Sequence, residues 1–339
     1  MVADWLVNEQ GWDKNNIQLL KNGIARWTEQ KPASLDYLPG FQTLVPPEYV
    51  SQVAAEIPHV KVVQIGWDGN KAKDYRKEHI PGAIYWDDIE FEMPPIWENR
   101  PVNVIRTSLQ GLGIDKNTSV IVYSTDSIMA ARAAVVMKYA GVKDVVMMNG
   151  NMDLWKKNGL TTESGWNEPV AIDDFGVTGA GDRSVVIDID EAKQLREQPD
   201  SALVSIRSWR EYTGQVSGYD YFQKRGRIQG ALWGHAGNSS WNMDHYHNPD
   251  NTMRNYKQIA EFWADWNITP DMNLSFYCGN GARASEVWWY AQAMGYTNST
   301  VYTSGWMRWR NDENARASGE LTKEEALSDW RSVSGTNQG

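Results

Sequence analysis

The sequence has few of the residues that cross-link small secreted proteins or bind metal ions. It contains one cysteine, Cys278, and five histidines in 339 residues. A single cysteine cannot form a disulfide within the chain, so cysteine usage does not identify the redox compartment. Asp244, His245 and His247 lie together in an asparagine-rich loop, but their spacing supplies no complete ligand set. We expect this loop to be a lid or a piece of surface, and we expect neither a metal nor another cofactor.

Long hydrophobic runs and an excess of basic residues are also missing. No stretch approaches the roughly 18 apolar residues that a membrane-spanning helix requires, and no signal peptide is visible at Met1. The formal charge of −10 argues against nucleic acid or an anionic membrane as the main partner. An apolar fraction of 41% is enough for substantial cores, and most of the 18 tryptophans are expected to pack in them or between domains. These properties fit a soluble enzyme of two or slightly more domains.

Three segments of the chain match one another without gaps and reveal an internal repeat. Residues 17–27, 145–155 and 299–309 each resemble a short strand, a Gly/Asn turn and the start of a helix that carries a tryptophan. The two later copies also match upstream, where residues 120–124 align with residues 274–278. Solenoid repeats have periods of about 20 to 50 residues, and this period is longer, so the pattern predicts tandem domains.

The first copy of the repeat is incomplete. We interpret residues 1–30 as the C-terminal remnant of a domain whose larger part is missing, and residues 1–40 as that remnant with a linker. The native gene product is then expected to be longer at its N-terminus. The alternative is a short arm that resembles the repeat by accident. The gap-free match, which includes the glycine and Trp27, favours the remnant.

The remaining chain alternates strand and helix patterns, which predicts α/β domains, each a parallel sheet with helices on both faces. We place a middle domain at residues 41–175 and a C-terminal domain at residues 183–313. The glycine-rich residues 176–182 are the expected linker. Residues 314–339 are polar and are expected to form a surface or frayed tail.

The expected elements follow the same order in both domains. In the middle domain we predict strands at 60–65, 84–86, 119–123 and 144–148. We also predict a helix at 47–56, a helix that ends at residue 140 and a helix that begins at residue 152. In the C-terminal domain we predict strands at 185–187, 202–206 and 274–277, with helices at 191–197, 256–266 and beyond 283. In parallel sheets a ligand lies beyond the carboxyl ends of the strands, which is where Cys278 falls.

Cys278 lies in a glycine-containing loop between a buried strand and a helix that ends at Gly295. A lone cysteine is often only a small, inert hydrophobic residue. Here the glycines let backbone N–H groups turn toward the sulfur, and the helix places its positive dipole end beside it. Both effects stabilise a thiolate. We therefore predict that Cys278 is a nucleophile in an anion cradle, whose loop residues are Gly279, Asn280, Gly281, Ala282 and Arg283.

These features together resemble the rhodanese sulfurtransferase family. Residues 78–84 (EHIPGAI) are similar to the family's G-H-I-P-G-A turn, and residues 206–214 (IRSWREYTG) to its D-x-R-x-x-x-E-Y-x-x-G segment. Residues 302–309 (YTSGWMRW) resemble its closing D-G-G-x-x-x-W, and the loop from Cys278 to Arg283 has the family's six-residue form. The family includes the related 3-mercaptopyruvate sulfurtransferases. Within it, the chain most resembles a bacterial three-domain rhodanese-like sulfurtransferase whose first domain is truncated. Ser205 departs from the aspartate that is common in the D-x-R motif.

The resemblance implies sulfur transfer in two steps. The Cys278 thiolate takes the outer sulfur of a donor such as thiosulfate or 3-mercaptopyruvate, and the resulting persulfide passes it to cyanide, another thiol or a protein acceptor. Ser124 stands at the nucleophile position of the middle domain, in a loop without glycines. We expect that domain to be non-catalytic and to wall the active site of the C-terminal domain. The resemblance also implies a periplasmic location, with a cytoplasmic one as the alternative.

Spacing separates this chemistry from that of the cysteine phosphatases. Those enzymes need an arginine six positions after the cysteine to clasp a tetrahedral phosphate, and here that position is Ala284. The arginine comes one place earlier, at Arg283. The shorter loop suits a single sulfur atom better than a phosphate group.

The substrate-binding candidates are arginines. Arg283 can orient a carboxylate or sulfonate through its planar fork, or it can start a helix and point to solvent. Arg225 lies where related enzymes bring substrate arginines toward the loop, or it is a solvated turn residue. Arg207 is expected to be structural. The neutral Gly279 and Asn280 look more like the C-G-S-G loop of mercaptopyruvate sulfurtransferases than like the basic loops of thiosulfate-specific ones.

Two kinds of function therefore remain open from the sequence. The first is an enzyme that turns over a small-molecule sulfur donor and a thiol or protein acceptor. The second is an interaction module that only carries a persulfide on Cys278 while docked to another protein. Turnover with free donors separates them. Neither requires nucleic acid or a membrane.

Overall fold

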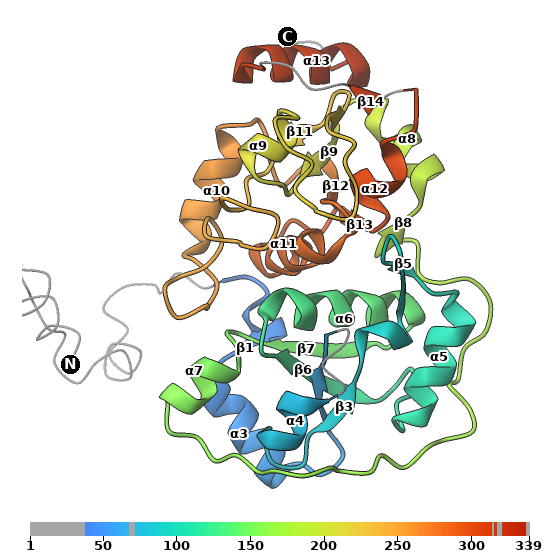
Figure 1. Ribbon diagram of the computed structural model, residues 1–339, viewed down its shortest axis with the longest axis vertical. Helices are drawn as coiled ribbons and strands as arrows, with labels where there is room; N and C mark the ends of the chain where they lie inside the picture. The colour runs from blue at the N-terminus through green and yellow to red at the C-terminus, as the bar shows by residue number, and fades with distance from the viewer. Residues whose placement is uncertain (1–37, 68–71, 314, 317–320, 337–339) are drawn as a thin grey trace, which may run out of the picture. The chain divides into compact units, whose positions relative to one another are not determined.

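Two five-stranded parallel sheets organise the part of the chain that the computed structural model describes, which is residues 38–67, 72–313, 315–316 and 321–336 (Figure 1). Residues from Pro39 onward form one compact unit. The predicted N-terminal remnant at residues 1–30 lies outside the described residues. Among the described helices, none is long and apolar enough to cross a membrane.

The middle domain has the strand order β1-β7-β6-β2-β3, with every neighbouring pair parallel. Its strands are β1 (Leu44–Val45), β2 (Lys61–Ile65), β3 (Ile84–Trp86), β6 (Ser119–Ser124) and β7 (Asp144–Met148). One face is covered by α3 (Pro47–Glu56), α4 (Lys73–Lys77) and α7 (Met152–Lys157), and the other by α5 (Val102–Gly111) and α6 (Ser127–Ala140) (Figure 1). The remaining short pieces are η2 (Phe41–Thr43), η3 (Asp88–Glu90) and the hairpin of β4 (Glu92–Met93) and β5 (Glu98–Asn99).

The C-terminal domain has the strand order β11-β9-β12-β13-β8, again all parallel. Its strands are β8 (Val186–Ile187), β9 (Ser201–Ser205), β11 (Leu232–Trp233), β12 (Asn273–Tyr277) and β13 (Ser299–Tyr302). Helices α8 (Ile189–Arg196) and α12 (Gly305–Trp309) lie on one face, and α10 (Tyr256–Ala264) and α11 (Ala282–Met294) on the other. The domain also contains α9 (Trp209–Tyr212), α13 (Lys323–Ser334) and an antiparallel pair of β10 (Arg227–Ile228) and β14 (Ala315–Arg316).

The two sheets repeat each other strand for strand. Reading outward from the central strand, β6 corresponds to β12, β7 to β13, β1 to β8, β2 to β9 and β3 to β11. The segments that match in sequence, residues 145–155 and 299–309, contain β7 and β13 and begin the helices that follow them. The predicted fold of tandem α/β domains with parallel sheets is therefore confirmed.

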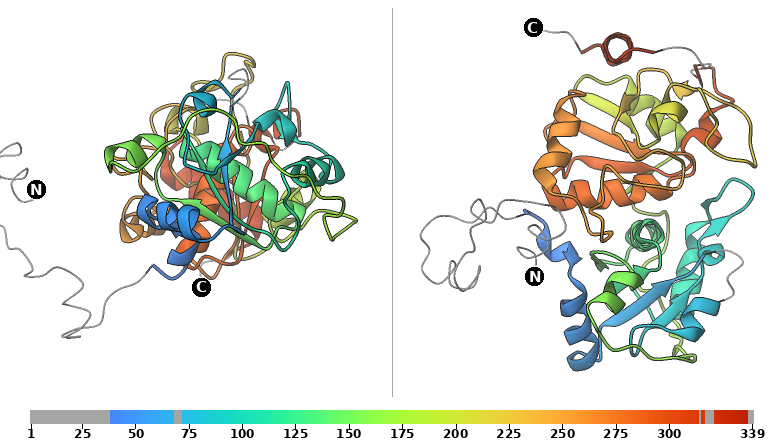
Figure 2. Two further views of the ribbon diagram at one scale, coloured as in Figure 1. Left: turned by 90° about the horizontal axis from the view of Figure 1, so that it is seen from below. Right: turned by 60° about the vertical axis from the view of Figure 1, so that its left-hand side comes forward.

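Helices α6 and α11 pack against each other and join the two domains (Figures 1 and 2). Each helix is buried around nearly its whole circumference, as expected for a helix that has its own sheet on one side and another domain on the other. Side-chain and backbone hydrogen bonds extend the contact: Trp289 Nε1 donates to the Thr43 carbonyl at 2.9 Å, and the Met253 N–H donates to Asn149 Oδ1 at 2.8 Å. Each domain therefore forms one wall of the space between the two domains.

The end of the chain differs from the sequence prediction. Residues 314–339 were predicted to form a surface or frayed tail, but Lys323–Ser334 is a helix with a complete capping box between Thr322 and Glu325. Its Trp330 is 6% exposed, and the indole Nε1 donates to the Ser201 carbonyl at 2.9 Å. The segment is polar because one face meets water, while the face that carries Trp330 packs on β9 and β11.

Trp330→Ala should destabilise the protein by about 3 kcal/mol, since it removes a large buried side chain and leaves a cavity. Urea unfolding followed by circular dichroism measures the change. The control is Val170→Ala, whose side chain is 77% exposed and whose loss should cost less than about 0.5 kcal/mol. Equal stability of the two variants would mean that α13 does not contribute to the fold.

Candidate active site

The loop after β12 holds the cysteine in a fixed backbone cradle. Cys278 follows the last residue of the strand and is fully buried. The backbone N–H of Gly281 donates to Cys278 Sγ at 3.2 Å, and α11 begins at the next residue. Gly281 has φ +97°, and a Cβ atom there would lie 2.6 Å from the Thr303 carbonyl oxygen. Glycine is therefore required at this position for both conformation and space.

The loop is also held from below by the closing motif of the repeat. The N–H groups of Trp306 and Met307 donate to the carbonyls of Cys278 and Gly279 at 2.8 and 2.9 Å. A Cβ atom at Gly305 would lie 2.6 Å from both of these carbonyl oxygens, so that residue must also be glycine. Trp306 and Met307, which directly follow Gly305, therefore hold the cysteine loop in place through its carbonyl groups.

Arg283 is the centre of a buried charged network and does not point to solvent. It is 2% exposed, and its two terminal nitrogens donate to the two carboxylate oxygens of Glu211 at 3.0 and 2.9 Å. The same guanidinium donates to the Tyr219 hydroxyl at 3.0 Å. Burial alone would raise the pKa of Glu211, but Arg283 and Arg207 outweigh it and lower that pKa to about 2. The carboxylate is thus ionised at every physiological pH, and it neutralises Arg283.

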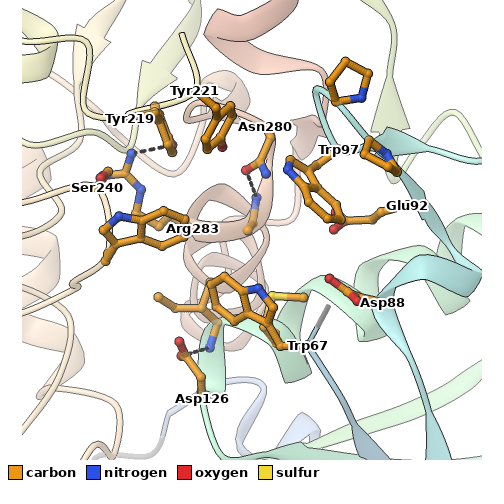
Figure 3. A pocket seen from close by; sticks show the side chains of 16 residues that line it. Trp67, Asp88, Glu92, Trp97, Asp126, Tyr219, Tyr221, Ser240, Asn280 and Arg283 are labelled. Carbon is orange, nitrogen blue, oxygen red and sulfur yellow. Dashed lines mark hydrogen bonds between the residues drawn. The ribbon is translucent and has the colours of Figure 1, made fainter. Parts of the chain in front are cut away.

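A cavity of about 370 Å³ lies over this loop, between the two domains (Figure 3). The C-terminal domain contributes Tyr219, Tyr221, Ser240, Trp241, Asn280, Ala282 and Arg283. The middle domain contributes Trp67, Asp88, Glu92, Pro94, Pro95, Trp97, Asp126, Ile128 and Met129. Figure 3 shows Asn280 from the cysteine loop between Tyr221 and Trp97. The loop that carries the sulfur therefore faces a chamber that neither domain forms alone.

Two carboxylates and one histidine from the two domains lie near one another beside this cavity. Asp126 caps α6 by accepting from the Ile128 N–H at 3.0 Å. Burial and the neighbouring Glu286 raise the pKa of Asp126 to about 6. His247 Nε2 lies 3.0 Å from Glu286 Oε1. Burial would lower the pKa of His247, but Glu286 and Asp126 raise it above its ordinary value.

The sequence profile described as "Rhodanese-like domain" matches residues 51–158 and 188–312, which is more than half of the chain. The chain belongs to the rhodanese family. The two matched regions contain all strands of the two sheets except β1 and β8, and the second contains the Cys278 loop. The rhodanese resemblance inferred from the sequence motifs is confirmed.

Named relatives support the same assignment. The rhodanese-family chain is 41% identical to Thiosulfate sulfurtransferase YnjE of Escherichia coli over 314 residues, covering 90% of this chain and 71% of the relative. It is 28% identical to Sulfur carrier protein TtuD of Thermus thermophilus, covering 80% of this chain and 94% of that one. The crystal structure of YnjE superposes with a TM-score of 0.83 over 91% of this chain and 80% of that chain. This rhodanese is accordingly a sulfurtransferase.

Solved structures of a second protein, EanB, are as similar in fold to this chain as the structure of YnjE is. A structure of EanB with a cysteine persulfide, in a tetrahedral intermediate state with ergothioneine, has a TM-score of 0.85 and 34% identity. It covers 92% of this chain and 78% of that chain. The similarity extends over both rhodanese domains.

The structure bears on the alternatives that the sequence left open for two of the arginines of this rhodanese. Arg225 is exposed, donates to the Gln215 carbonyl at 3.1 Å and does not line the cavity, which matches the alternative of a solvated turn residue. Arg283 does line the cavity, but Glu211 already occupies its planar fork. Arg207 is structural as predicted, since it is buried and donates to the Gly226 carbonyl at 2.8 Å.

Ser124 stands at the nucleophile position of the middle domain. Ser124 is buried, and its hydroxyl donates to the Ile65 carbonyl at 2.9 Å. The asparagine-rich loop contributes Ser240 and Trp241 to the cavity wall. Within the described part of the chain, no group of three or more His, Cys, Asp or Glu residues is placed to hold a metal ion.

Sequence reasoning missed most of the cavity wall. Glu211, Tyr219 and Tyr221 lie close to the recognised motif at residues 206–214, and the run Tyr219-Asp220-Tyr221-Phe222 is a visible aromatic cluster. Trp97 and Glu92 carry no comparable signal, because they come from a hairpin of the domain without the cysteine. Only the packing of α6 on α11 brings them to the Cys278 loop.

Gly281→Ala should lower sulfur transfer by at least about tenfold, equal to about 1.4 kcal/mol of lost transition-state stabilisation. The reason is that the new methyl group must displace the Thr303 backbone and with it the N–H that faces the sulfur. Gly159→Ala is the matched control, because Gly159 also has a positive φ, +70°, but has open space around its Cβ position. Steady-state kinetics on both variants test this. Unchanged kcat/KM in Gly281→Ala would show that the cradle is not needed.

Glu211→Gln should destabilise the protein at pH 7 by about 3 kcal/mol, since it leaves buried arginines without their counter-charge. The pKa of Glu211 is lowered by folding from 4.5 to about 2, so its contribution is complete above pH 4.5 and is lost as the pH falls toward 2. Urea unfolding of wild type and variant at several pH values should show the difference shrinking only below about pH 4.5. The exposed Glu56, changed to Gln, is the control and should show no such trend.

Proposed function

We propose that this rhodanese moves a sulfane sulfur from thiosulfate or 3-mercaptopyruvate to a thiophilic acceptor through a persulfide on Cys278. The observation that carries the proposal is the position of the sulfur: it lies at the carboxyl end of β12, and the Gly281 N–H points at it from the start of α11 at 3.2 Å. A backbone donor at a helix N-terminus stabilises negative charge on sulfur. Both the attacking thiolate and the persulfide need that stabilisation.

The proposed reaction has two halves. In the first, the Cys278 thiolate attacks the outer sulfur of the donor, a new S–S bond forms, and the old bond to that sulfur breaks. Thiosulfate then leaves as sulfite, and 3-mercaptopyruvate leaves as pyruvate after its thiol proton moves to carbon. In the second half, the acceptor attacks the terminal sulfur and Cys278 leaves as the thiolate. The cycle needs no cofactor and changes no net redox state.

Support for the persulfide comes from two directions. YnjE is named a thiosulfate sulfurtransferase, and EanB has been solved with a persulfide on a cysteine. In this chain Gly279 lets the Tyr219 ring pack directly against the cysteine loop, since a Cβ atom there would collide with the Tyr219 hydroxyl. A carrier function without turnover is the second candidate, and the full burial of Cys278 together with the similarity to the sulfur carrier TtuD favours it.

Intact-mass spectrometry separates these candidates. The full chain is incubated with thiosulfate and, separately, with 3-mercaptopyruvate. An enzyme gains one sulfur on Cys278 from a free donor and loses it to cyanide over many cycles. A carrier gains no sulfur from either donor and is loaded only by a protein partner. The donor that loads faster at equal concentration is the preferred one.

Cys278→Ser should abolish sulfur transfer, because an alcohol cannot form the persulfide and the chain has no second cysteine. The measurement is thiocyanate formation with cyanide as acceptor. Ser124→Ala should keep the rate within about twofold, since that hydroxyl only binds the Ile65 carbonyl and a lost buried hydrogen bond costs about 1 kcal/mol in stability. Residual activity of Cys278→Ser above about one per cent of wild type would overturn the covalent route, which requires a thiolate nucleophile.

We also propose a periplasmic location, on the basis of the resemblance to exported three-domain sulfurtransferases. Expression of the native gene with a C-terminal epitope, followed by osmotic shock, tests it. Release of the epitope with a periplasmic marker is the expected result. Retention with a cytoplasmic marker would contradict the proposal.

A further inference from the structure

The charges around the cavity do not suit an anionic ligand. Among the described residues that line it, Arg283 is the only cationic side chain, and the Glu211 behind it pairs with both Arg283 and the buried Arg207. Glu92 of the cavity wall is in turn paired with Arg132 of α6. Two more carboxylates line the cavity, from Asp88 and Asp126. Carboxylates therefore outnumber cations in and directly behind this wall, and the potential inside a concave, weakly solvated site is negative.

Five aromatic residues line the cavity beside these charges: Trp67, Trp97, Tyr219, Tyr221 and Trp241. Trp67, Tyr221 and Trp241 are 39%, 44% and 53% exposed although they are large apolar side chains, and all three line the cavity. The rings of Trp67 and Trp241 lie 5.5 Å apart and inclined by 45°, and those of Tyr219 and Trp241 lie 5.8 Å apart at 81°. Rings that meet at such angles present faces in several directions around one space.

Aromatic faces and carboxylates together recognise a particular chemistry. The face of an aromatic ring attracts a cation, most strongly an alkylated ammonium that is weakly hydrated. Exposed tryptophan faces backed by carboxylates therefore favour a quaternary ammonium group over a neutral group of the same shape. The volume of about 370 Å³ is within the range of small-molecule sites.

We propose that this cavity binds the sulfur acceptor, and that the acceptor is a small organic cation whose quaternary ammonium group lies among the aromatic rings while its thiolate faces the Cys278 loop. The inference rests on the proposed persulfide function and names the substrate class of its second half. The thiolate of the cation attacks the outer sulfur of the Cys278 persulfide, the S–S bond to Cys278 breaks, and Cys278 leaves as a thiolate. The product is the persulfide of the cation, so atoms and electrons balance without a further reagent.

Binding is tested first, without any sulfur chemistry. Isothermal titration calorimetry of the full chain compares choline with its neutral carbon isostere, 3,3-dimethylbutan-1-ol. The expected result is at least tenfold tighter binding of choline. Equal affinity of the two, or no binding of choline, overturns the proposal.

Variants then locate the site. Trp97→Leu and Trp241→Leu should each weaken choline binding at least fivefold, whereas Trp166→Leu, a 38% exposed tryptophan outside the cavity, should leave it unchanged. Asp126→Asn removes one negative charge but keeps a side chain that caps helices well. It should weaken choline binding severalfold and leave the binding of the isostere unchanged. A uniform loss for both ligands would indicate a packing defect and would contradict the charge argument.

Turnover completes the test. Thiocholine and 3,3-dimethylbutane-1-thiol are compared as acceptors, and the ratio of their kcat/KM values in wild type is divided by the same ratio in Asp126→Asn. Differences in intrinsic thiol reactivity cancel in this quotient, which should exceed about three. A quotient of one overturns the assignment of the acceptor. If choline binds but Cys278 acquires no sulfur, the proposed function fails alone; if Cys278 acquires sulfur but choline does not bind, the cation proposal fails alone.

Discussion

The packing of α6 against α11 is the interaction on which the rest of the structure depends. Both helices are buried on nearly all sides, so neither domain presents a complete surface without the other. The N-termini of the two helices border the same chamber, with Asp126 at one and the Cys278 loop at the other. Loss of this contact would expose two apolar helices and at the same time remove one wall of the active site.

The second constraint is the buried ion pair between Arg283 and Glu211. It differs from what is expected of enzymes that bind sulfur-containing anions. A helix-start arginine beside a nucleophilic cysteine suggests a ligand for sulfonate or carboxylate. Here the pair with Glu211 uses both terminal nitrogens of Arg283, and Tyr219 takes a further donor. Among the described residues the Gly281 N–H is the hydrogen-bond donor to the sulfur, and Arg283 holds the loop, α9 and the aromatic wall in one arrangement.

The sequence was sufficient to predict the bounds of those helices and strands that carry strong local patterns. Helix Pro47–Glu56 and strands Ile84–Trp86 and Asp144–Met148 lie where periodicity and the proline start predict them. The Cys278 loop was predictable because glycines, strand and helix are contiguous in the chain. Two-residue strands such as β1 and β11 are too short for any period to show. Helix α13 was missed because a single face of buried residues, chiefly Ala326 and Trp330, is hidden among charged neighbours.

The cavity wall could not be predicted for a different reason. Its members come from loops of two domains, and which loops meet is decided by the helix packing and not by any motif. The strand-for-strand correspondence of the two sheets has a consequence for the ancestry of the site. Ser124 occupies the place of Cys278, and Asp126 the place of Asn280. The loop that has no thiol in one copy faces the thiol loop of the other, so residues of both copies line one cavity. Substitutions in the copy without the thiol can therefore change the shape and charge of this cavity without altering the loop that carries Cys278.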